Sequence, residues 1–169
     1  MDRFFQKIIT SQLIIYTVRC LIGFVIGYKL LLAFPEYELF WLLLSIILVI
    51  SPEGKDSRKL TIDRVRSNFI GSIVGLFCLM IDQNLNIGVL MFGIVITSII
   101  CYLFKIMNTA RVAVVALLII LLQPHLSDIE LTPFVRFATV TAGCLIGLTI
   151  TVLSSMLIRK LKRKYGIVY

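Results

Sequence analysis

The stretch RVRSNFIGSIVG, residues 64–75, returns in related form as RFATVTAGCLIG, residues 136–147. Each copy begins with an arginine, Arg64 or Arg136, and carries one glycine seven residues later and a second glycine four residues after that. The offset between the two copies is 72 residues. The chain therefore contains an internal repeat.

The repeat continues upstream of these stretches. Leu42 to Pro52 (LLLSIILVISP) aligns with Val114 to Pro124 (VVALLIILLQP), proline on proline. Each copy consists of an apolar span, a proline, a polar loop, an arginine and a glycine-rich span. With three spans in each copy, an odd number, the second copy must lie upside down in a membrane. Inverted repeats are typical of transporters and channels whose permeation site lies between the two copies.

The composition requires a membrane. The chain has 169 residues, of which 59% are hydrophobic, and a hydrocarbon core about 30 Å thick needs helices of about 20 apolar residues. We expect an all-α, polytopic protein with six transmembrane helices in a 3+3 inverted repeat. The expected spans are 8–34, 37–50, 65–81, 87–104, 110–122 and 133–158. The first turns, around residues 4–9, are expected to lie amphipathically in the interface.

These spans define one transmembrane domain, 1–158, with repeat halves at about 8–82 and 87–158, followed by a basic tail, 159–169. Ser51-Pro52 and Thr132-Pro133 each resemble an N-cap followed by the first helical residue, so each predicts a helix start. The tail sequence RKLKRK, 159–164, is expected to contact anionic lipids. The length leaves no room for a sizeable soluble domain.

The charge distribution predicts the orientation. With the N-terminus inside, the inner segments hold 14 of the 17 basic residues, as the positive-inside rule requires of short loops. Both termini are therefore predicted to be cytoplasmic, and the net charge of +8 indicates membrane orientation rather than nucleic-acid binding. No cleavable signal peptide is evident. The four cysteines all lie in apolar spans without metal-ligand spacing, so we expect packing roles, no metal and no cofactor.

The spans 37–50 and 110–122 are short and occupy corresponding places in the two copies. At 1.5 Å per residue each reaches only about 20 Å. Paired short spans indicate a transport site, although hydrophobic mismatch absorbed by local thinning of the bilayer is an alternative explanation.

Arg19 is the most unusual residue of the first span. It lies 12 residues beyond Lys7, which is about 18 Å deeper in a continuous helix and near the membrane middle. An arginine there is costly unless it faces water, an anion or a partner. Gly23 and Gly27 share its helix face and permit close approach of another backbone. The alternative is that Arg19 snorkels to the inner interface.

The two repeat arginines are expected at opposite surfaces, Arg64 on the cytoplasmic side and Arg136 on the outer side. With Arg19 near the middle, they would form a positive path that selects anions. Anchoring at the membrane surface is the alternative, and it explains Arg64 better than Arg136. Candidate hydrogen-bonding residues for a bound anion are Ser67, Asn68, Thr139 and Thr141. Gly71, Gly75, Gly143 and Gly147 predict close helix packing.

Acidic groups and enzyme motifs are missing from the spans. No Asp or Glu lies deep within any of them, and His125, the one histidine, falls in an outer loop. A proton-coupled carrier usually needs such a titratable group, so passive, voltage-driven movement of anions is predicted. The sequence holds no HExxH motif, nucleophile–base pair or phosphate loop, so no enzyme activity is expected.

Several of these residues resemble the fusaric-acid-resistance-like (FUSC) family, which includes bacterial aromatic acid exporters and is similar to plant aluminium-activated malate transporters. The resemblance rests on the following positions: Arg19, Trp41, Pro52, Gly54, Arg64, Gly71 and Gly75. Ser67-Asn68 stands where the family pattern has Gly-Thr. The resemblance implies a six-span, anion-permeating unit that acts in pairs, hence a homodimer, in the bacterial inner membrane. It also implies a periplasmic adaptor as a partner.

The sequence thus predicts a small, dimeric inner-membrane exporter or channel for organic anions such as aromatic carboxylates. The alternative is a non-transporting membrane scaffold or regulatory subunit, whose arginines bind lipid head groups or acidic residues of a partner. A cation or drug carrier would need a buried acid, which the spans lack.

Overall fold

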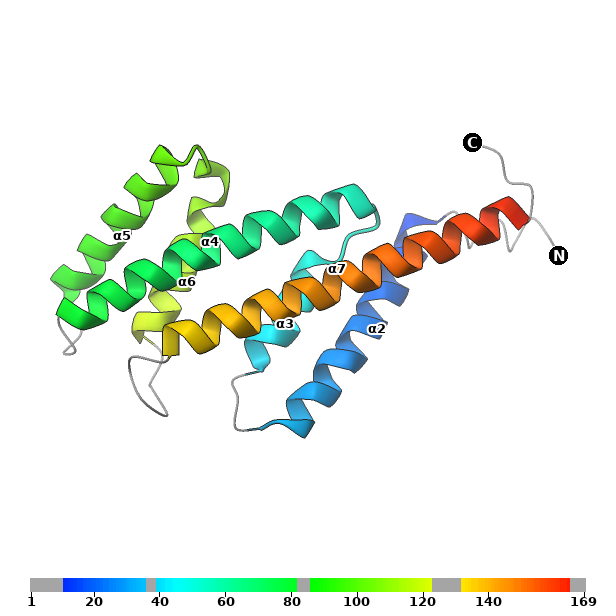
Figure 1. The fold of residues 1–169 in the computed structure, drawn as a ribbon, viewed down its shortest axis with the longest axis horizontal. Coiled ribbons are helices and arrows are strands. Elements are labelled where there is room, and N and C mark those ends of the chain that lie inside the picture. The colour runs from blue at the N-terminus through cyan, green and yellow to red at the C-terminus, as the bar shows by residue number, and fades with distance from the viewer. Residues whose placement is uncertain (1–10, 36–38, 82–85, 123–131, 165–169) are drawn as a thin grey trace. The chain divides into compact units, whose positions relative to one another are not determined.

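The computed structural model describes residues 11–35, 39–81, 86–122 and 132–164, and every regular element within these ranges is helical. The helices are α2 (Gln12–Ala33), α3 (Phe40–Val49), α4 (Gly54–Ile81), α5 (Ile87–Leu103), the 3₁₀ turn η1 (Met107–Thr109), α6 (Ala110–Leu122) and α7 (Thr132–Lys164), as Figure 1 shows. The prediction of an all-α protein is confirmed. The expected interfacial turns at residues 4–9 and the outer loop with His125 lie outside the described residues.

Three helices are long and apolar enough to cross a membrane, namely Gln12–Ala33, Gly54–Ile81 and the Pro133–Arg163 part of α7. The other apolar helices, Phe40–Val49, Ile87–Leu103 and Met107–Leu122, are shorter. The helices that match the two predicted short spans, α3 and α6, have 10 and 13 residues. The chain is a membrane protein.

The predicted start of the third span is wrong. Helix α4 begins at Gly54, so most of the expected polar loop before Val65 is helical. Ser51-Pro52 does not open this helix, because the backbone N–H of Ser57 donates to the carbonyl of Glu53 at 3.2 Å. The carboxylate of Asp56 lies in the first turn, where it interacts favourably with the helix dipole. Hydropathy does not detect such a polar first portion of a helix.

The last helix is also longer than predicted. Helix α7 runs from Thr132 to Lys164, so the basic residues expected in the tail continue the helix. Pro133 lies in its first turn, where the missing N–H of a proline costs no intrahelical bond.

The described helices form two compact units, and each is considered by itself. Unit 1 consists of Met1–Thr61 and Ala142–Tyr169, and unit 2 consists of Ile62–Thr141. Both boundaries fall inside long helices, so α4 and α7 each contribute to both units. In unit 1, α2 packs beside α3 (Figure 1), and the core contains Leu42, Ile46, Ile50 and Ile150. In unit 2, α5 packs beside α6, and the core contains Val74, Cys78, Leu117 and Ile120.

The repeat glycines make matching contacts in the two units. In unit 1, a Cβ on Gly143 of α7 would overlap the carbonyl oxygen of Leu42 and lie 2.9 Å from the Cβ of Ser45, both on α3. In unit 2, a Cβ on Gly71 of α4 would lie 2.6 Å from the carbonyl oxygen of Ala113 and 2.9 Å from the Cβ of Ala116, both on α6. In both cases the glycine meets a carbonyl and the side chain three residues later.

The second glycines follow the same arrangement. A Cβ on Gly147 would lie 2.7 Å from the carbonyl oxygen of Ile46 on α3, and one on Gly75 would lie 3.0 Å from the side chain of Ile120 on α6. Each unit therefore packs the glycine-rich helix of one repeat copy against the short helix of the other copy. The third helix of each repeat copy thus packs against the second helix of the other copy, an arrangement that we call the exchange of third helices.

Helix α5 ends in a Schellman motif with lysine at the left-handed position. Lys105 has φ 55°, its N–H donates to the carbonyl of Tyr102 at 3.0 Å, and the N–H of Ile106 donates to the carbonyl of Cys101 at 2.9 Å. Glycine is the usual residue at such a position because it has no Cβ. Ile106 packs against Cys101, which is the apolar contact that accompanies this motif.

Candidate functional site

Arg19 lies in the interior of unit 1. Its side chain is 2% exposed, and it shares a face of α2 with Gly23 and Gly27. A Cβ on Gly23 would lie 2.7 Å from the side chain of Ile50, and one on Gly27 would lie 3.2 Å from that of Ile46. These two glycines allow α2 to approach α3 closely, and the close approach buries Arg19.

The guanidinium of Arg19 binds the segment that follows α3. Its Nη1 donates to the carbonyl oxygens of Ser51 at 2.6 Å and Pro52 at 2.8 Å, and its Nη2 donates to the Ser155 hydroxyl at 2.8 Å. Both carbonyls belong to the segment between α3 and α4. The Nε atom is buried and has no hydrogen-bond partner among the described residues. Within that part of the chain, Arg19 is therefore held by neutral groups.

The contact with Ser155 continues into a network of buried hydroxyls. The Ser155 hydroxyl donates to the carbonyl of Thr151 at 2.7 Å, and the Thr151 hydroxyl donates to the carbonyl of Gly147 at 3.0 Å. The Ser57 hydroxyl donates to the Thr151 hydroxyl at 3.3 Å and accepts from the backbone N–H of Ser51 at 3.0 Å. The network links the start of α4, α7 and the segment that Arg19 binds.

Sequence reasoning missed this network. A signal was nevertheless present, because Gly143, Gly147, Thr151 and Ser155 follow one another at intervals of four and therefore share one face of α7. The hydroxyls continue the glycine stripe. The backbone acceptors of Arg19 have no side-chain signature and could not have been found from the sequence.

The remaining predicted anion-binding residues all belong to unit 2. Arg64, Ser67 and Asn68 lie on α4, and Arg136, Thr139 and Thr141 lie on α7. The rings of Phe69 and Phe137, with centroids 5.4 Å apart, join these two helix segments. The structure thus brings six of the seven predicted residues into one unit and places Arg19 in the other.

The two repeat arginines are followed by equivalent hydroxyls. The Ser67 hydroxyl donates to the carbonyl of Arg64 at 3.2 Å and to that of Asp63 at 2.7 Å, and the Thr139 hydroxyl donates to the carbonyl of Arg136 at 3.0 Å. Arg136 is 5% exposed, whereas Arg64 is half-buried. Both hydroxyls donate to their own helix, so each offers a ligand acceptor lone pairs.

Unit 2 also holds buried polar atoms that are not satisfied within the described residues. They include Nδ2 of Asn68 and the hydroxyls of Ser72, Thr97 and Thr141. Asn68 and Thr141 were predicted from the sequence, whereas Ser72 and Thr97 were not. Buried polar atoms are nearly always hydrogen-bonded, so each of these is open to a partner beyond the described residues, such as water or a ligand.

The described residues contain no group of three or more His, Cys, Asp or Glu side chains that could hold a metal ion. Cys78, Cys101 and Cys144 are buried free thiols. Cys78 packs within the unit 2 core, where its Sγ would lie 3.0 Å from a Cβ on Gly93.

The long apolar helices, the close helix contacts at glycines and the buried Arg19 are features of an integral membrane protein. The family model described as fusaric acid resistance protein-like matches residues 20–150. Since this match covers well over half of the chain, the protein belongs to that family, and the resemblance seen in the sequence is confirmed. The family comprises membrane transporters rather than enzymes. No curated protein and no solved structure matches the chain.

Proposed function

We propose that the protein is a dimeric, voltage-driven exporter or channel for organic anions, such as aromatic carboxylates, in the bacterial inner membrane. Family membership supports membrane transport in general. The choice of an anion rests on the arginines, and the choice of a passive mechanism rests on the scarcity of acidic groups in the apolar parts of the helices.

The observation that carries the proposal is the environment of Arg19. Burying an arginine among apolar helices is costly unless it has polar partners, and the partners of Arg19 lie at or near the ends of the second and sixth predicted spans. Its described partners are two carbonyls and one hydroxyl, which stabilise the cation without cancelling its charge. Among the described residues no acidic group neutralises Arg19, so an anion that approaches unit 1 meets a positive charge, and the Nε–H of Arg19 remains as a donor.

Unit 2 supplies the second part of the proposed path. Arg136 contributes a buried guanidinium, and Asn68 and Thr141 contribute polar atoms that lack partners among the described residues. In the proposal, Arg64 and Arg136, which lie on either side of the Phe69–Phe137 ring contact in unit 2, attract the anion, and Ser67, Asn68, Thr139 and Thr141 replace part of its hydration. Membrane potential provides the driving force, since 100 mV contributes about 2.3 kcal/mol per monovalent charge.

The internal repeat supports six crossings with inverted halves. Equivalent glycines, Gly71 and Gly143, contact equivalent backbone positions of the two short helices, as expected if both copies build the same structural unit. In transporters built from inverted repeats, the transport pathway lies at the interface between the two repeat copies. In the proposal, both termini are cytoplasmic and two copies of the chain complete the assembly.

The test is flux through liposomes that contain the purified protein under a potassium–valinomycin potential. Chloride, malate and 4-hydroxybenzoate are followed for wild type, Arg19→Gln and Arg19→Lys. A unit charge 4 Å from the anion contributes up to about 4 kcal/mol at an effective dielectric constant of 20, so flux in Arg19→Gln should fall at least about tenfold. Arg19→Lys keeps the charge and should retain more flux than Arg19→Gln.

Ser155→Ala is the matched control. It removes the hydroxyl acceptor of Arg19 while leaving the charge in place, so it should keep most of the flux. Equal flux in wild type, Arg19→Gln and Ser155→Ala, each shown to be folded, would contradict the role of the charge. Absence of flux in folded wild type would favour the scaffold alternative.

A further inference from the structure

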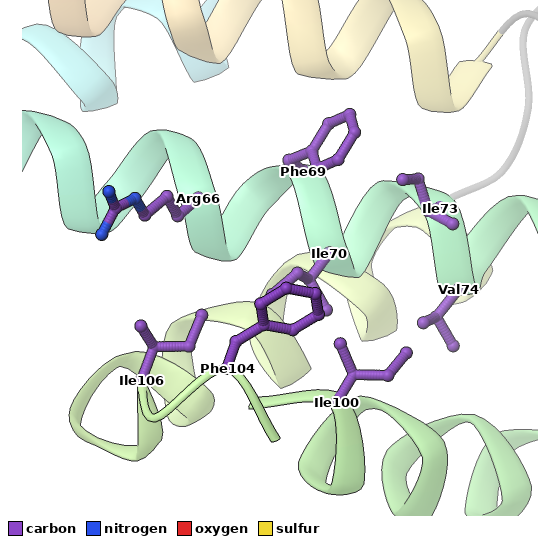
Figure 2. A pocket seen from close by; sticks show the side chains of 8 residues that line it. All are labelled: Arg66, Phe69, Ile70, Ile73, Val74, Ile100, Phe104 and Ile106. Atoms are coloured by element: carbon purple, nitrogen blue, oxygen red, sulfur yellow. The ribbon is translucent and has the colours of Figure 1, made fainter. Parts of the chain in front are cut away.

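Unit 2 carries an open cavity that the proposed anion path does not use. Its volume is about 660 Å³, and its walls come from α4, α5 and the segment that follows α5 (Figure 2). Seven of its eight lining residues are apolar, and the eighth is Arg66. We call this cavity the α4–α5 groove.

The groove opens at the surface of unit 2. Three of the side chains that line it are strongly exposed: Phe69 and Ile73 are each 49% exposed, and Phe104 is 71% exposed. Figure 2 shows Arg66 toward one end, near Ile106, and Ile73 toward the other. From residue 66 to residue 73, α4 advances about 10 Å at 1.5 Å per residue. The α4–α5 groove is thus lined by apolar side chains and has a cationic side chain at one end.

A second cation comes from the segment that follows α5. Lys105 is exposed and stands between Phe104 and Ile106, both of which line the groove. The Schellman motif of α5 fixes this segment, with Lys105 held at φ 55°. A non-glycine residue in the left-handed region costs about 1 kcal/mol or more, so Lys105 occupies this position against a local conformational preference.

We propose that the α4–α5 groove binds an anionic phospholipid, with one acyl chain along the apolar walls and the phosphate against Arg66 and Lys105. The chemistry fits because a fatty chain is apolar along its length and charged at one end, as the groove is. Basic pockets between transmembrane helices are known to hold anionic head groups.

The proposal is independent of transport and can be tested on the purified protein. Native mass spectrometry of the protein in mixed micelles compares retention of phosphatidylglycerol with retention of phosphatidylcholine, both with oleoyl chains. Wild type should retain phosphatidylglycerol preferentially. Arg66→Gln should weaken that retention about fivefold, the factor expected for one basic side chain at an anionic membrane surface.

Two further variants separate lipid binding from folding. Lys105→Gly removes the cation and relieves the strained φ, so it should weaken phosphatidylglycerol retention without lowering the unfolding temperature. Ile73→Trp narrows the groove and keeps both charges, so it should reduce retention of either lipid. The control, Arg58→Gln, removes an exposed charge from α4 outside the groove and should leave retention unchanged.

Three outcomes would overturn the proposal. Equal retention of the two lipids by wild type would remove the role of the cations. Equal losses in Arg66→Gln and Arg58→Gln would indicate general surface charge. A shift from dimer to monomer in Ile73→Trp, with lipid retention intact, would identify a second copy as the occupant.

Discussion

The two compact units share a helix crossing but satisfy their buried polar groups differently. In unit 1, the Ser57 and Thr151 hydroxyls, on residues that are 0% exposed, are bonded to one another and to the backbone. In unit 2, the Thr97 hydroxyl is as deeply buried, with its residue 0% exposed, yet has no partner among the described residues. The same glycine-mediated helix crossing therefore lies beside a hydrogen-bonded network in unit 1, called the closed network, and beside polar atoms without described partners in unit 2, called the open network.

This difference distinguishes polar side chains that stabilise the fold from polar side chains that are available to a ligand. The hydroxyls of unit 1 position the segment that Arg19 binds, and removing any of them exposes an unmet partner. In unit 2, Nδ2 of Asn68 and the hydroxyls of Thr97 and Thr141 make no hydrogen bond among the described residues, so water or a ligand is free to satisfy them. Substitutions at the glycine crossing, in the closed network and in the open network should therefore differ in their effects on stability and on flux.

The largest effect is expected at the crossing itself. Gly71→Ala and Gly143→Ala each place a methyl group against backbone carbonyls that cannot move without separating the helices, and overpacking of this kind costs about 1–3 kcal/mol or more. Both variants should lower the unfolding temperature in detergent by similar amounts. Gly88→Ala is the control, since a Cβ there would meet nothing within 4 Å. A stable Gly143→Ala would show that the α3–α7 crossing is looser than described.

A matched pair of isosteric substitutions tests the two networks. Thr151→Val in unit 1 removes a hydroxyl that donates to Gly147 and accepts from Ser57, and leaving such partners unmet costs about 1–3 kcal/mol. Thr97→Val in unit 2 removes a hydroxyl without a described partner, so stability should be unchanged or higher. Thermal unfolding of both variants in one detergent gives the comparison. Equal destabilisation would mean that Thr97 is as firmly bonded as Thr151.

The smallest effect on stability, with a measurable effect on flux, is expected at Asn68. Its Nδ2 has no described partner, so Asn68→Leu should unfold at the wild-type temperature. If the amide replaces water around a passing anion, loss of one hydrogen bond worth about 1 kcal/mol should slow flux about fivefold. Liposome flux and thermal unfolding of the same preparation check both statements. Lower stability with unchanged flux would make Asn68 a structural residue.

Parts of this fold were predictable because an apolar run ends where its helix ends. Helix α6 has the predicted bounds, Ala110–Leu122, and α5 ends one residue before the predicted Phe104. The start of α4 was not predictable from hydropathy, since its first turns at Gly54 are polar. The Asp56 carboxylate in the first turn interacts favourably with the helix dipole at that start.

The candidate site was predictable only where side-chain chemistry marks it. Arg19 stood out as a charge within an apolar span. Its carbonyl partners at Ser51 and Pro52 are backbone atoms without a sequence signature, so its anchored position emerged only from the structure. The exchange of third helices between the repeat copies was likewise hidden, because a repeat in sequence does not specify which copy packs against which.

The most direct test of the central claim is the reversal potential of a planar bilayer that contains the protein, under a tenfold gradient of potassium 4-hydroxybenzoate. A positive charge at Arg19 selects anions, so the wild-type reversal potential should lie near the equilibrium potential of the anion and move toward zero in Arg19→Gln. A wild-type reversal potential near that of potassium, or one unchanged by Arg19→Gln, would contradict the account.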